Sequence, residues 1–325
     1  MRFVFSAVAA WLLAIAFQAR AEDTWPRRPI TIVVPFQAGG SADLLARIVQ
    51  QQLQAEMGVP FVVENRSGGG GSIGTAYVAK APNDGYTLLL GTLSTNVLNE
   101  FMNRNLPYHA ERDFQPITLL VRLPNLLVVG PHNQAKTVLE LIDYIKANDG
   151  KLNYGSSGIG TFSHLAVVMF ELATGTHMTH VPFRSTVDEV TNLMNGSIDL
   201  AIDSMTTLWP QAQTGSIRAV AVSGENRSPS APELPAIGET LKGYAVSSWQ
   251  GLLAPAGTPR PIVDRIAAAL MVVFQRPEVQ RELTKVGAEP AFMGPDEFAA
   301  YIKSELPKWR AVVKASGVHL GDLNK

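Results

Sequence analysis

Apolar residues along this chain alternate between short uninterrupted runs and longer stretches with helical spacing. Ile30–Val34 is a run of β-forming residues, as expected for a strand buried on both faces, and a helical stretch follows from Ser41 to about Met57. This alternation continues downstream, which predicts an α/β fold with a mostly parallel sheet and helices on both faces. Further strands are expected at 61–64, 87–91, 153–155, 200–203 and 218–222, and one more is expected to end at Val181. Further helices are expected at 74–80, 162–174 and 186–195, and after Ser94 or Thr95 and Thr137. The last three are expected to begin at Pro259, Pro277 and Pro295.

Two apolar stretches, 116–129 and 246–254, separate these zones of alternation. We interpret them as two crossings between two α/β domains. The first domain is then discontinuous, with residues 22–123 and 248–325, and the second comprises residues 124–247. Because a cleft between two such domains is a common place for a small ligand, we expect the ligand there.

The first residues have the features of a secretory signal. Arg2 is followed by an apolar stretch at 3–17, and small residues stand at Ala19 and Ala21. We therefore expect a signal peptide over residues 1–21, cleaved before Glu22, and a periplasmic protein. The alternative is a membrane anchor, but a span needs about twenty apolar residues and this stretch is shorter.

Composition excludes several classes of function. The chain has 27 basic and 28 acidic residues, so no basic excess favours nucleic acid as a partner. It has no cysteine, which excludes disulfides, thiolate catalysis and cysteine–metal sites. Residues 69–74 match the G-x-G-x-x-G pattern of dinucleotide-binding proteins. The next strand, however, ends at Gly91-Thr92 and not at the acidic residue that would hold the ribose of a dinucleotide. His177 and His180 have no third ligand nearby in the sequence. We expect no cofactor and no metal.

One enzymatic alternative remains open. Gly155-Ser156-Ser157-Gly158 is similar to the sharp turn that carries the nucleophile of many hydrolases, although Ile159 occupies the position of its last glycine. His164 could serve Ser157 as a base. The alternative function is therefore an exported serine hydrolase that uses Ser157 and His164.

Short polar loops at the expected ends of strands favour the binding of an anion instead. Residues 37–41, 92–95 and 157–163 each precede an expected helix. Helix starts present backbone N–H groups and the positive end of the helix dipole, which stabilise negative charge. Several such loops facing each other would hold a carboxylate without a metal or cofactor. We also expect Asp203, at the end of a strand, either to contact an amine or hydroxyl of the ligand or to cap the next helix.

Six segments, taken in chain order, carry the pattern of one known family. They are residues 35–43 with Ala46-Arg47, 63–66 with Ile73-Gly74, 79–88, 154–158 with His164-Leu165, 181–184 and 249–259. They resemble the Bug-type receptors, which are the extracytoplasmic solute-binding proteins of tripartite tricarboxylate transporters. The resemblance covers essentially the whole mature chain in the right order.

The resemblance implies a two-domain, type II periplasmic-binding-protein fold whose cleft closes on a small carboxylate such as a dicarboxylate, an amino acid or an aromatic acid. It implies a receptor that is not an enzyme and that delivers its ligand to membrane permease subunits; a sensor role is not separable from this by sequence. We expect a monomer. Taken together, the expected ligand-binding residues are Phe36, Ala38, Gly39, Gly40, Ser94, Thr95, Ser156, Ser157, Thr161, Phe183, Arg184 and Asp203.

One segment departs from the family pattern. The family usually has Tyr-Lys-Gly or Tyr-Arg-Gly where this chain has Phe183-Arg184-Ser185-Thr186. The expected wall of the second domain is therefore altered. Arg184 could hold a distal carboxylate with two hydrogen bonds, or it could point outward and pair with Asp188 or Glu189 on the next helix.

Overall fold

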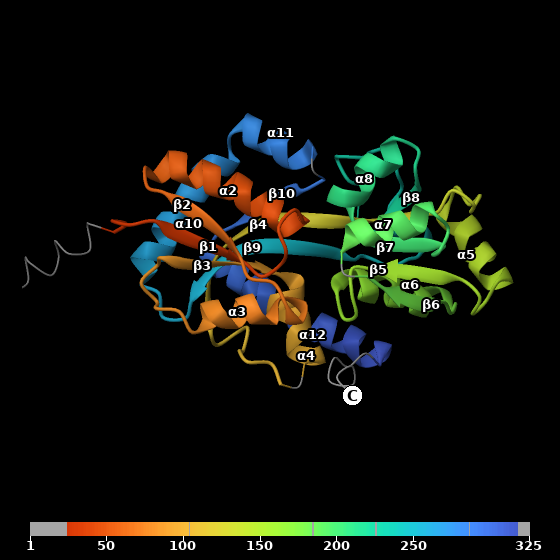
Figure 1. Cartoon of the computed structure of the whole chain (residues 1–325), viewed down its shortest axis with the longest axis horizontal. Coiled ribbons are helices and arrows are strands. Elements are labelled where there is room, and N and C mark those ends of the chain that lie inside the picture. Colours follow the sequence, from red (N-terminus) through yellow and green to blue (C-terminus); the bar gives the residue numbers. More distant parts are fainter. Residues whose placement is uncertain (1–24, 104, 184, 225, 286, 318–325) are drawn as a thin grey trace, which may run out of the picture.

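The computed structural model describes residues 25–103, 105–183, 185–224, 226–285 and 287–317 (Figure 1). Their strands form one mixed sheet with the order β2-β1-β3-β9-β4-β7-β5-β6, and both β8 and β10 also pair with β4. The strands are β1 (Ile30–Val34), β2 (Phe61–Asn65), β3 (Thr87–Thr92), β4 (Phe114–Val129), β5 (Asn153–Ser156), β6 (Thr179–Pro182), β7 (Leu200–Ser204), β8 (Arg218–Val222), β9 (Ser247–Pro255) and β10 (Glu289–Met293).

Helices connect these strands largely where the apolar spacing predicts them. Thr137 caps α5 as expected, because its Oγ1 accepts a hydrogen bond from the N–H of Glu140 at 3.1 Å. The helices are α2 (Ser41–Met57), η1 (Gly69–Gly71), α3 (Ser72–Ala79), η2 (Ser94–Leu98), α4 (Asn99–Met102), α5 (Val138–Ala147), α6 (Phe162–Thr174), α7 (Thr186–Met194), α8 (Met205–Gln213), α9 (Ile237–Thr240), α10 (Arg260–Phe274), α11 (Pro277–Lys285) and α12 (Pro295–Ser316).

Two long strands, β4 and β9, join two lobes. The first part of β4 pairs with β9 and β10, and its last part pairs with β7 and β8. We call β1, β2, β3 and β10 with their helices the first lobe, and β5 to β8 with their helices the second lobe. Figure 1 shows β4 and β9 running from one lobe to the other. The two apolar stretches interpreted as crossings are these strands.

The expectation of a mostly parallel sheet is wrong. Parallel pairing is confined to β1 with β2 and β3, and to β5 with β6 and β7. Strands β4 and β9 are antiparallel to each other, and each is also antiparallel to its other neighbours in the sheet. Strand β10 was not expected either, since its Glu289-Pro290 start does not resemble a buried strand.

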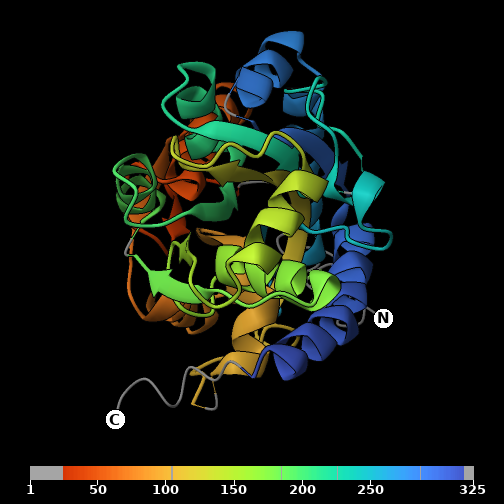
Figure 2. The same cartoon turned by 90° about the vertical axis from the view of Figure 1, so that its right-hand side faces the viewer.

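Helices cover both faces of the sheet, as the alternation predicts. Ile32 and Val34 of β1 belong to a core under α2 and α10, whereas Val33 between them belongs to a core on the opposite face. This second core continues from one lobe into the other. There Trp309 of α12 packs edge-on against Phe162 of α6 with ring centroids 5.5 Å apart. The two helices, α12 in blue and α6 in green, lie side by side (Figure 2). Among the described residues no helix combines the length and apolarity needed to cross a membrane.

Candidate functional site

The carboxyl ends of β3 and β7 face each other along β4. Thr92 ends β3 and pairs through Gln250 of β9 with Val121 of β4. Ser204 ends β7 and pairs with Asn125 of β4. Because β3 runs in the direction of β4 and β7 runs against it, both strands point toward the same short stretch of β4. Four residues of extended chain cover only about 14 Å, so the loops that follow the two strands approach each other.

Three loops of the first lobe converge at Gly71. A Cβ placed on Gly71 would lie 2.6 Å from Cγ2 of Thr95, after β3, and 3.2 Å from Cζ of Phe36, after β1. Gly71 itself lies after β2 and has a φ of +88°. The close approach of the three loops therefore requires a residue without a side chain at this position.

The loop after β1 is fastened by the carboxylate of Asp43. The N–H of Gly39 donates to its Oδ2 at 2.9 Å, the guanidinium of Arg47 donates to both oxygens, and Nδ2 of Asn65 donates to Oδ1 at 3.0 Å. Nδ2 of Asn65 also donates to the carbonyl of Phe36 at 3.2 Å. Although burial alone would raise the pKa of Asp43, these hydrogen bonds hold it below its usual value.

The glycines of this loop differ in their availability to a ligand. The N–H of Gly39 already has a partner in Asp43, so it is not a free donor in this structure. Gly40 precedes α2, and the first intrahelical hydrogen bond there runs from the N–H of Leu44 to the carbonyl of Gly40. The N–H groups of residues 40–43 therefore have no intrahelical acceptor. Ala38 is exposed beside them and Phe36 is half-buried.

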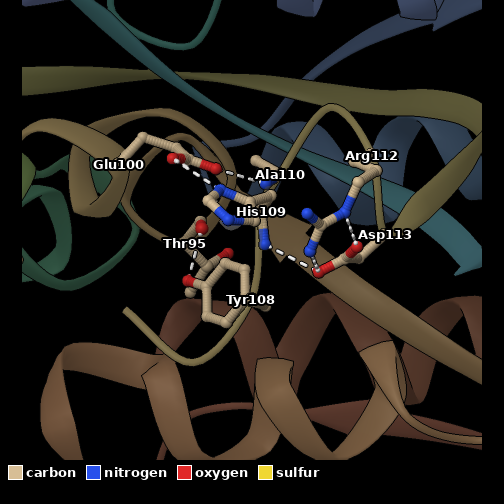
Figure 3. A network of polar contacts seen from close by, with 7 residues as sticks. All are labelled: Thr95, Glu100, Tyr108, His109, Ala110, Arg112 and Asp113. Atoms are coloured by element: carbon tan, nitrogen blue, oxygen red, sulfur yellow. Dashed lines mark hydrogen bonds and ion pairs between the residues drawn. The ribbon is translucent and has the colours of Figure 1, made fainter. Parts of the chain in front are cut away.

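The loop after β3 offers a ligand fewer available polar groups than the sequence suggests. Thr95 is fully buried, and its hydroxyl accepts from the N–H of Thr92 and donates to Oδ1 of Asn96 at 2.8 Å. The carbonyl of Thr95 accepts from the hydroxyl of Tyr108 at 2.6 Å (Figure 3). Thr95 therefore positions the loop, whereas Ser94 is only half-buried.

A surface hollow of about 280 Å³ lies next to the network in Figure 3 and is separate from the facing strand ends. It is lined by Glu100, Phe101, His109, Glu111, Arg112, Leu306 and Arg310.

The loop after β5 is built from internal hydrogen bonds between small polar residues. Oγ of Ser157 lies 2.9 Å from Oγ of Ser163, and Oγ1 of Thr161 donates to the carbonyl of Gly158 at 2.7 Å. Ser156 is fully buried, and its Oγ lies 2.6 Å from Nε2 of His180. The hydroxyls of this loop thus hold its shape, while Ser157 and Thr161 remain partly exposed.

Two neutral histidines support this loop from behind. The rings of His164 and His180 stack with centroids 3.9 Å apart, and Tyr154 stacks on His180 at 4.9 Å. Nδ1 of His164 accepts from the N–H of Gly160 at 3.1 Å. Burial lowers the pKa of His164 to about 4, and burial together with the charge of His164 lowers the pKa of His180 to about 3. Both rings are therefore neutral at pH 7.

The serine and histidine of the hydrolase alternative are not paired. Oγ of Ser157 contacts Ser163, while Nδ1 of His164 accepts from Gly160. The serine–histidine contact in the described residues joins Ser156 to His180 instead, and that serine has no solvent exposure. Within the described part of the chain, neither Ser156 nor Ser157 is therefore an accessible nucleophile paired with a histidine base.

The loop after β6 meets the loop after β5. The N–H of Phe183 donates to the carbonyl of Ser156 at 2.9 Å, and its half-buried ring packs on the core under α7 and α8. Arg184 lies outside the described residues. Ser185, which replaces the usual family glycine, caps α7 by accepting from the N–H of Asp188 at 3.2 Å. Glu189 cannot be the exposed partner expected for Arg184, because it is completely buried.

Asp203 lies at the carboxyl end of β7 with 6% of its surface exposed. Its Oδ1 accepts from the N–H of Ser204, the residue before α8. Ser204 and not Asp203 is the N-cap of that helix, so the expected capping role of Asp203 is not confirmed. Its Oδ2 is buried and has no hydrogen-bond donor.

Loop position was predictable from the sequence, whereas the side chains that hold the loops were not. Asn65, Gln250 and Glu189 were missed. Nε2 of Gln250 lies 3.4 Å from Oγ of Ser41, at the start of α2. Asp43 is visible in the sequence as an acidic residue in the first turn of α2. This signal could have revealed that its carboxylate holds the loop after β1.

Comparisons with known proteins agree along nearly the whole chain. A family model described as the tripartite tricarboxylate transporter family receptor matches residues 45–318. The "UPF0065 protein in tcbD-tcbE intergenic region" of Pseudomonas sp. strain P51 is 36% identical over 314 residues, covering 96% of this chain and 93% of that protein. Protein BugT of Bordetella pertussis strain Tohama I is 32% identical over 300 residues, covering 92% of each.

Solved structures share the fold over the same length. R. palustris Rpa4515 with adipate is 35% identical with a TM-score of 0.86, covering 91% of this chain and 99% of that one. MatC (Rpa3494) from Rhodopseudomonas palustris with bound malate is 31% identical with a TM-score of 0.80, covering 89% and 100%. The similarity therefore includes both lobes and the strands that join them.

Proposed function

The chain belongs to the receptor family of the tripartite tricarboxylate transporters, and we propose that it captures a small organic carboxylate in the periplasm and delivers it to the permease subunits of such a transporter. It is a solute receptor of the periplasmic-binding-protein type. Related proteins of this fold hold adipate and malate, both of which are carboxylates.

The observation that supports this function best is the opposition of the strand ends. Thr92 ends β3 and Ser204 ends β7, and their partners on β4, Val121 and Asn125, are four residues apart. The loops that follow carry small polar residues and, before α2, N–H groups without intrahelical acceptors. Such groups bind an anion well, so a carboxylate between the lobes needs neither a metal nor a cofactor.

The proposed site has one wall from each lobe. In the first lobe the main contributors are backbone groups of the loop from Phe36 to Gly40, with Ser94 beside it. In the second lobe they are the partly exposed residues of the loop after β5, with Phe183 and Asp203 nearby. Arg184 lies outside the described residues, and its contact with the ligand stays an expectation from the sequence. Thr95 and Ser156 act by holding their loops, since their hydroxyls are already engaged.

We further propose how the receptor works as a whole. Residues 1–21 direct export and are removed. Residues 22–123 with 248–325, and residues 124–247, are two domains that close on the ligand about the crossing strands. The receptor acts as a monomer, and it binds its ligand without changing it.

A screen of organic acids tests the proposal. We expect at least one unmodified carboxylate to raise the melting temperature and to bind saturably in calorimetry; a ligand at 100 times its Kd adds about 2.7 kcal/mol of stability. We expect no turnover of a chromogenic ester. Ester hydrolysis that is lost in Ser157→Ala, without saturable binding of any acid, would support the hydrolase instead.

A further inference from the structure

A pair of carboxyl groups is buried in the second lobe at the carboxyl end of β7. Glu189, in the first turn of α7, has no exposed surface, and Asp203 has 6%. The two carboxyl groups lie close enough for the charge of Asp203 to raise the pKa of Glu189. Glu189 lies directly against β5, because a Cβ placed on Gly155 would be 2.8 Å from its Cγ. The pair therefore sits immediately behind the loop that begins at Ser156.

The hydrogen bonds of this pair are incomplete. Oδ1 of Asp203 accepts from the N–H of Ser204, but Oδ2 of Asp203 and both carboxyl oxygens of Glu189 face no donor. Burial, followed by the charge of Asp203, raises the pKa of Glu189 well above its usual value, which favours its protonated form. A proton shared by the pair would satisfy two of these three oxygens, and the remaining buried oxygen would still lack a donor among the described residues.

No cation among the described residues forms an ion pair with either carboxyl group. The ion pairs of the described chain do not include Glu189 or Asp203. The face of β7 that carries Asp203 belongs to an apolar core with Val190, Leu193 and Ile198. A buried carboxylate in such surroundings is costly unless a donor reaches it.

The pair opens in one direction only. Asp203 retains some exposure and Glu189 none, so the pair lies nearest to solvent at Asp203, although Oδ2 of Asp203 is itself buried. Gly155 of β5 pairs with Ala201 of β7, and Ser157 and Asp203 each follow two residues later. Asp203 therefore stands at the same sheet edge as the loop after β5, where the proposed ligand lies.

We propose that Asp203, held in place by Glu189, forms a subsite for a hydrogen-bond-donating or positively charged substituent of the ligand. The receptor then prefers carboxylates that carry an amine or a hydroxyl over the same acids without one. This inference rests on the proposed function and narrows its ligand class. Asp203 contacts the substituent, and Glu189 is a positioning residue.

Matched acids measure this preference directly. We would determine Kd by calorimetry for succinate, L-malate and L-aspartate, and for adipate and 2-aminoadipate. For the wild-type protein we expect the best substituted acid of a series to bind about tenfold more tightly than the plain acid, or better, as hydrogen bonds to charged groups allow. Asp203→Asn should bring this ratio close to one while the plain acid still binds.

Two further variants separate positioning from general structure. Glu189→Gln should retain most of the preference, because its amide can donate to Asp203 in place of the carboxyl proton. Asp188→Asn removes an exposed carboxylate from the same turn of α7 and should leave the ratio unchanged. Circular dichroism would verify that each variant is folded.

The outcomes distinguish this inference from the proposed function. If plain acids bind the wild-type protein as tightly as their substituted partners, the subsite is wrong but the receptor function stands, and this result needs no variant. A preference that survives in folded Asp203→Asn also overturns the subsite. If no acid of a broad panel binds, both proposals fail.

Discussion

Gly39 and Asp43 are joined by a hydrogen bond of 2.9 Å, in which the backbone N–H of the glycine donates to Oδ2 of the carboxylate. The bond closes the loop after β1 onto the first turn of α2. Because the same carboxylate also accepts from Arg47 and Asn65, one side chain determines the shape of the first wall of the proposed site.

Removing this carboxylate should loosen the loop. In Asp43→Ala the N–H of Gly39 and the amide of Asn65 lose their acceptor, so we expect a loss of about 2 kcal/mol in the free energy of unfolding. The affinity for the carboxylate found in the acid screen should fall with it. Denaturant titration and calorimetry measure the two effects. Asp264→Ala removes an exposed carboxylate that pairs with Arg260 four residues away, and it should change neither quantity appreciably.

The two glycines before α2 should respond differently to alanine. Gly39 has a φ of +87° but no atom within 4 Å of a Cβ placed on it, so Gly39→Ala is strained in its backbone and not crowded. We expect it to lose about 1 kcal/mol of stability. Gly40 has a φ of −80° and its nearest neighbour is 3.8 Å away, so Gly40→Ala should be close to neutral. Equal melting temperatures for the two variants would contradict this backbone explanation.

The contact between Gly71 and Thr95 should be measurable as a coupling. Gly71→Ala places a methyl 2.6 Å from Cγ2 of Thr95 at a φ of +88°, and should destabilise the protein by about 2 kcal/mol or more. Thr95→Ser removes that methyl and keeps the hydroxyl. The double variant should therefore lose less stability than the sum of the single variants, by about 0.5 kcal/mol or more. Strict additivity in denaturant unfolding would mean that the three loops do not meet as described.

Stability should fall on mild acidification because of the stacked histidines. The ordinary histidine pKa is 6.5, whereas in the folded protein it is lowered to about 4 for His164 and about 3 for His180. Between pH 6.5 and pH 4 the unfolded chain therefore binds more protons than the folded one. The stability present above pH 6.5 is lost as the pH falls through this window, by up to about 1.4 kcal/mol per pH unit for His164.

A matched pair of variants isolates this effect from other groups that titrate in acid. His164→Asn keeps an acceptor for the N–H of Gly160 but does not titrate, so its free energy of unfolding should change less between pH 7 and pH 5 than that of the wild type. His177→Gln removes an exposed imidazole and should retain the wild-type slope. A wild-type slope in His164→Asn would show that this ring does not cause the acid sensitivity.

The sequence by itself determined the elements and the order of the loops. Ile30–Val34, Phe162–Thr174 and Arg218–Val222 are found at the predicted boundaries, because an apolar run or stripe and its cap lie within one short segment. The position of the candidate site at strand ends followed from the same local signals, and the family resemblance agreed with it.

Only the tertiary structure decided which segments meet. The antiparallel placement of β9 between β3 and β4, the pairing of β10, and the contact of Ser156 with His180 instead of Ser157 with His164 depend on residues far apart in the sequence. Glu189 shows the limit most clearly. In the sequence it is an ordinary charged residue in a first helical turn, and its burial against β5 and Asp203 arises only when three elements pack together. Local propensity carries no information on such packing, because the free energy that buries a side chain comes from its distant neighbours.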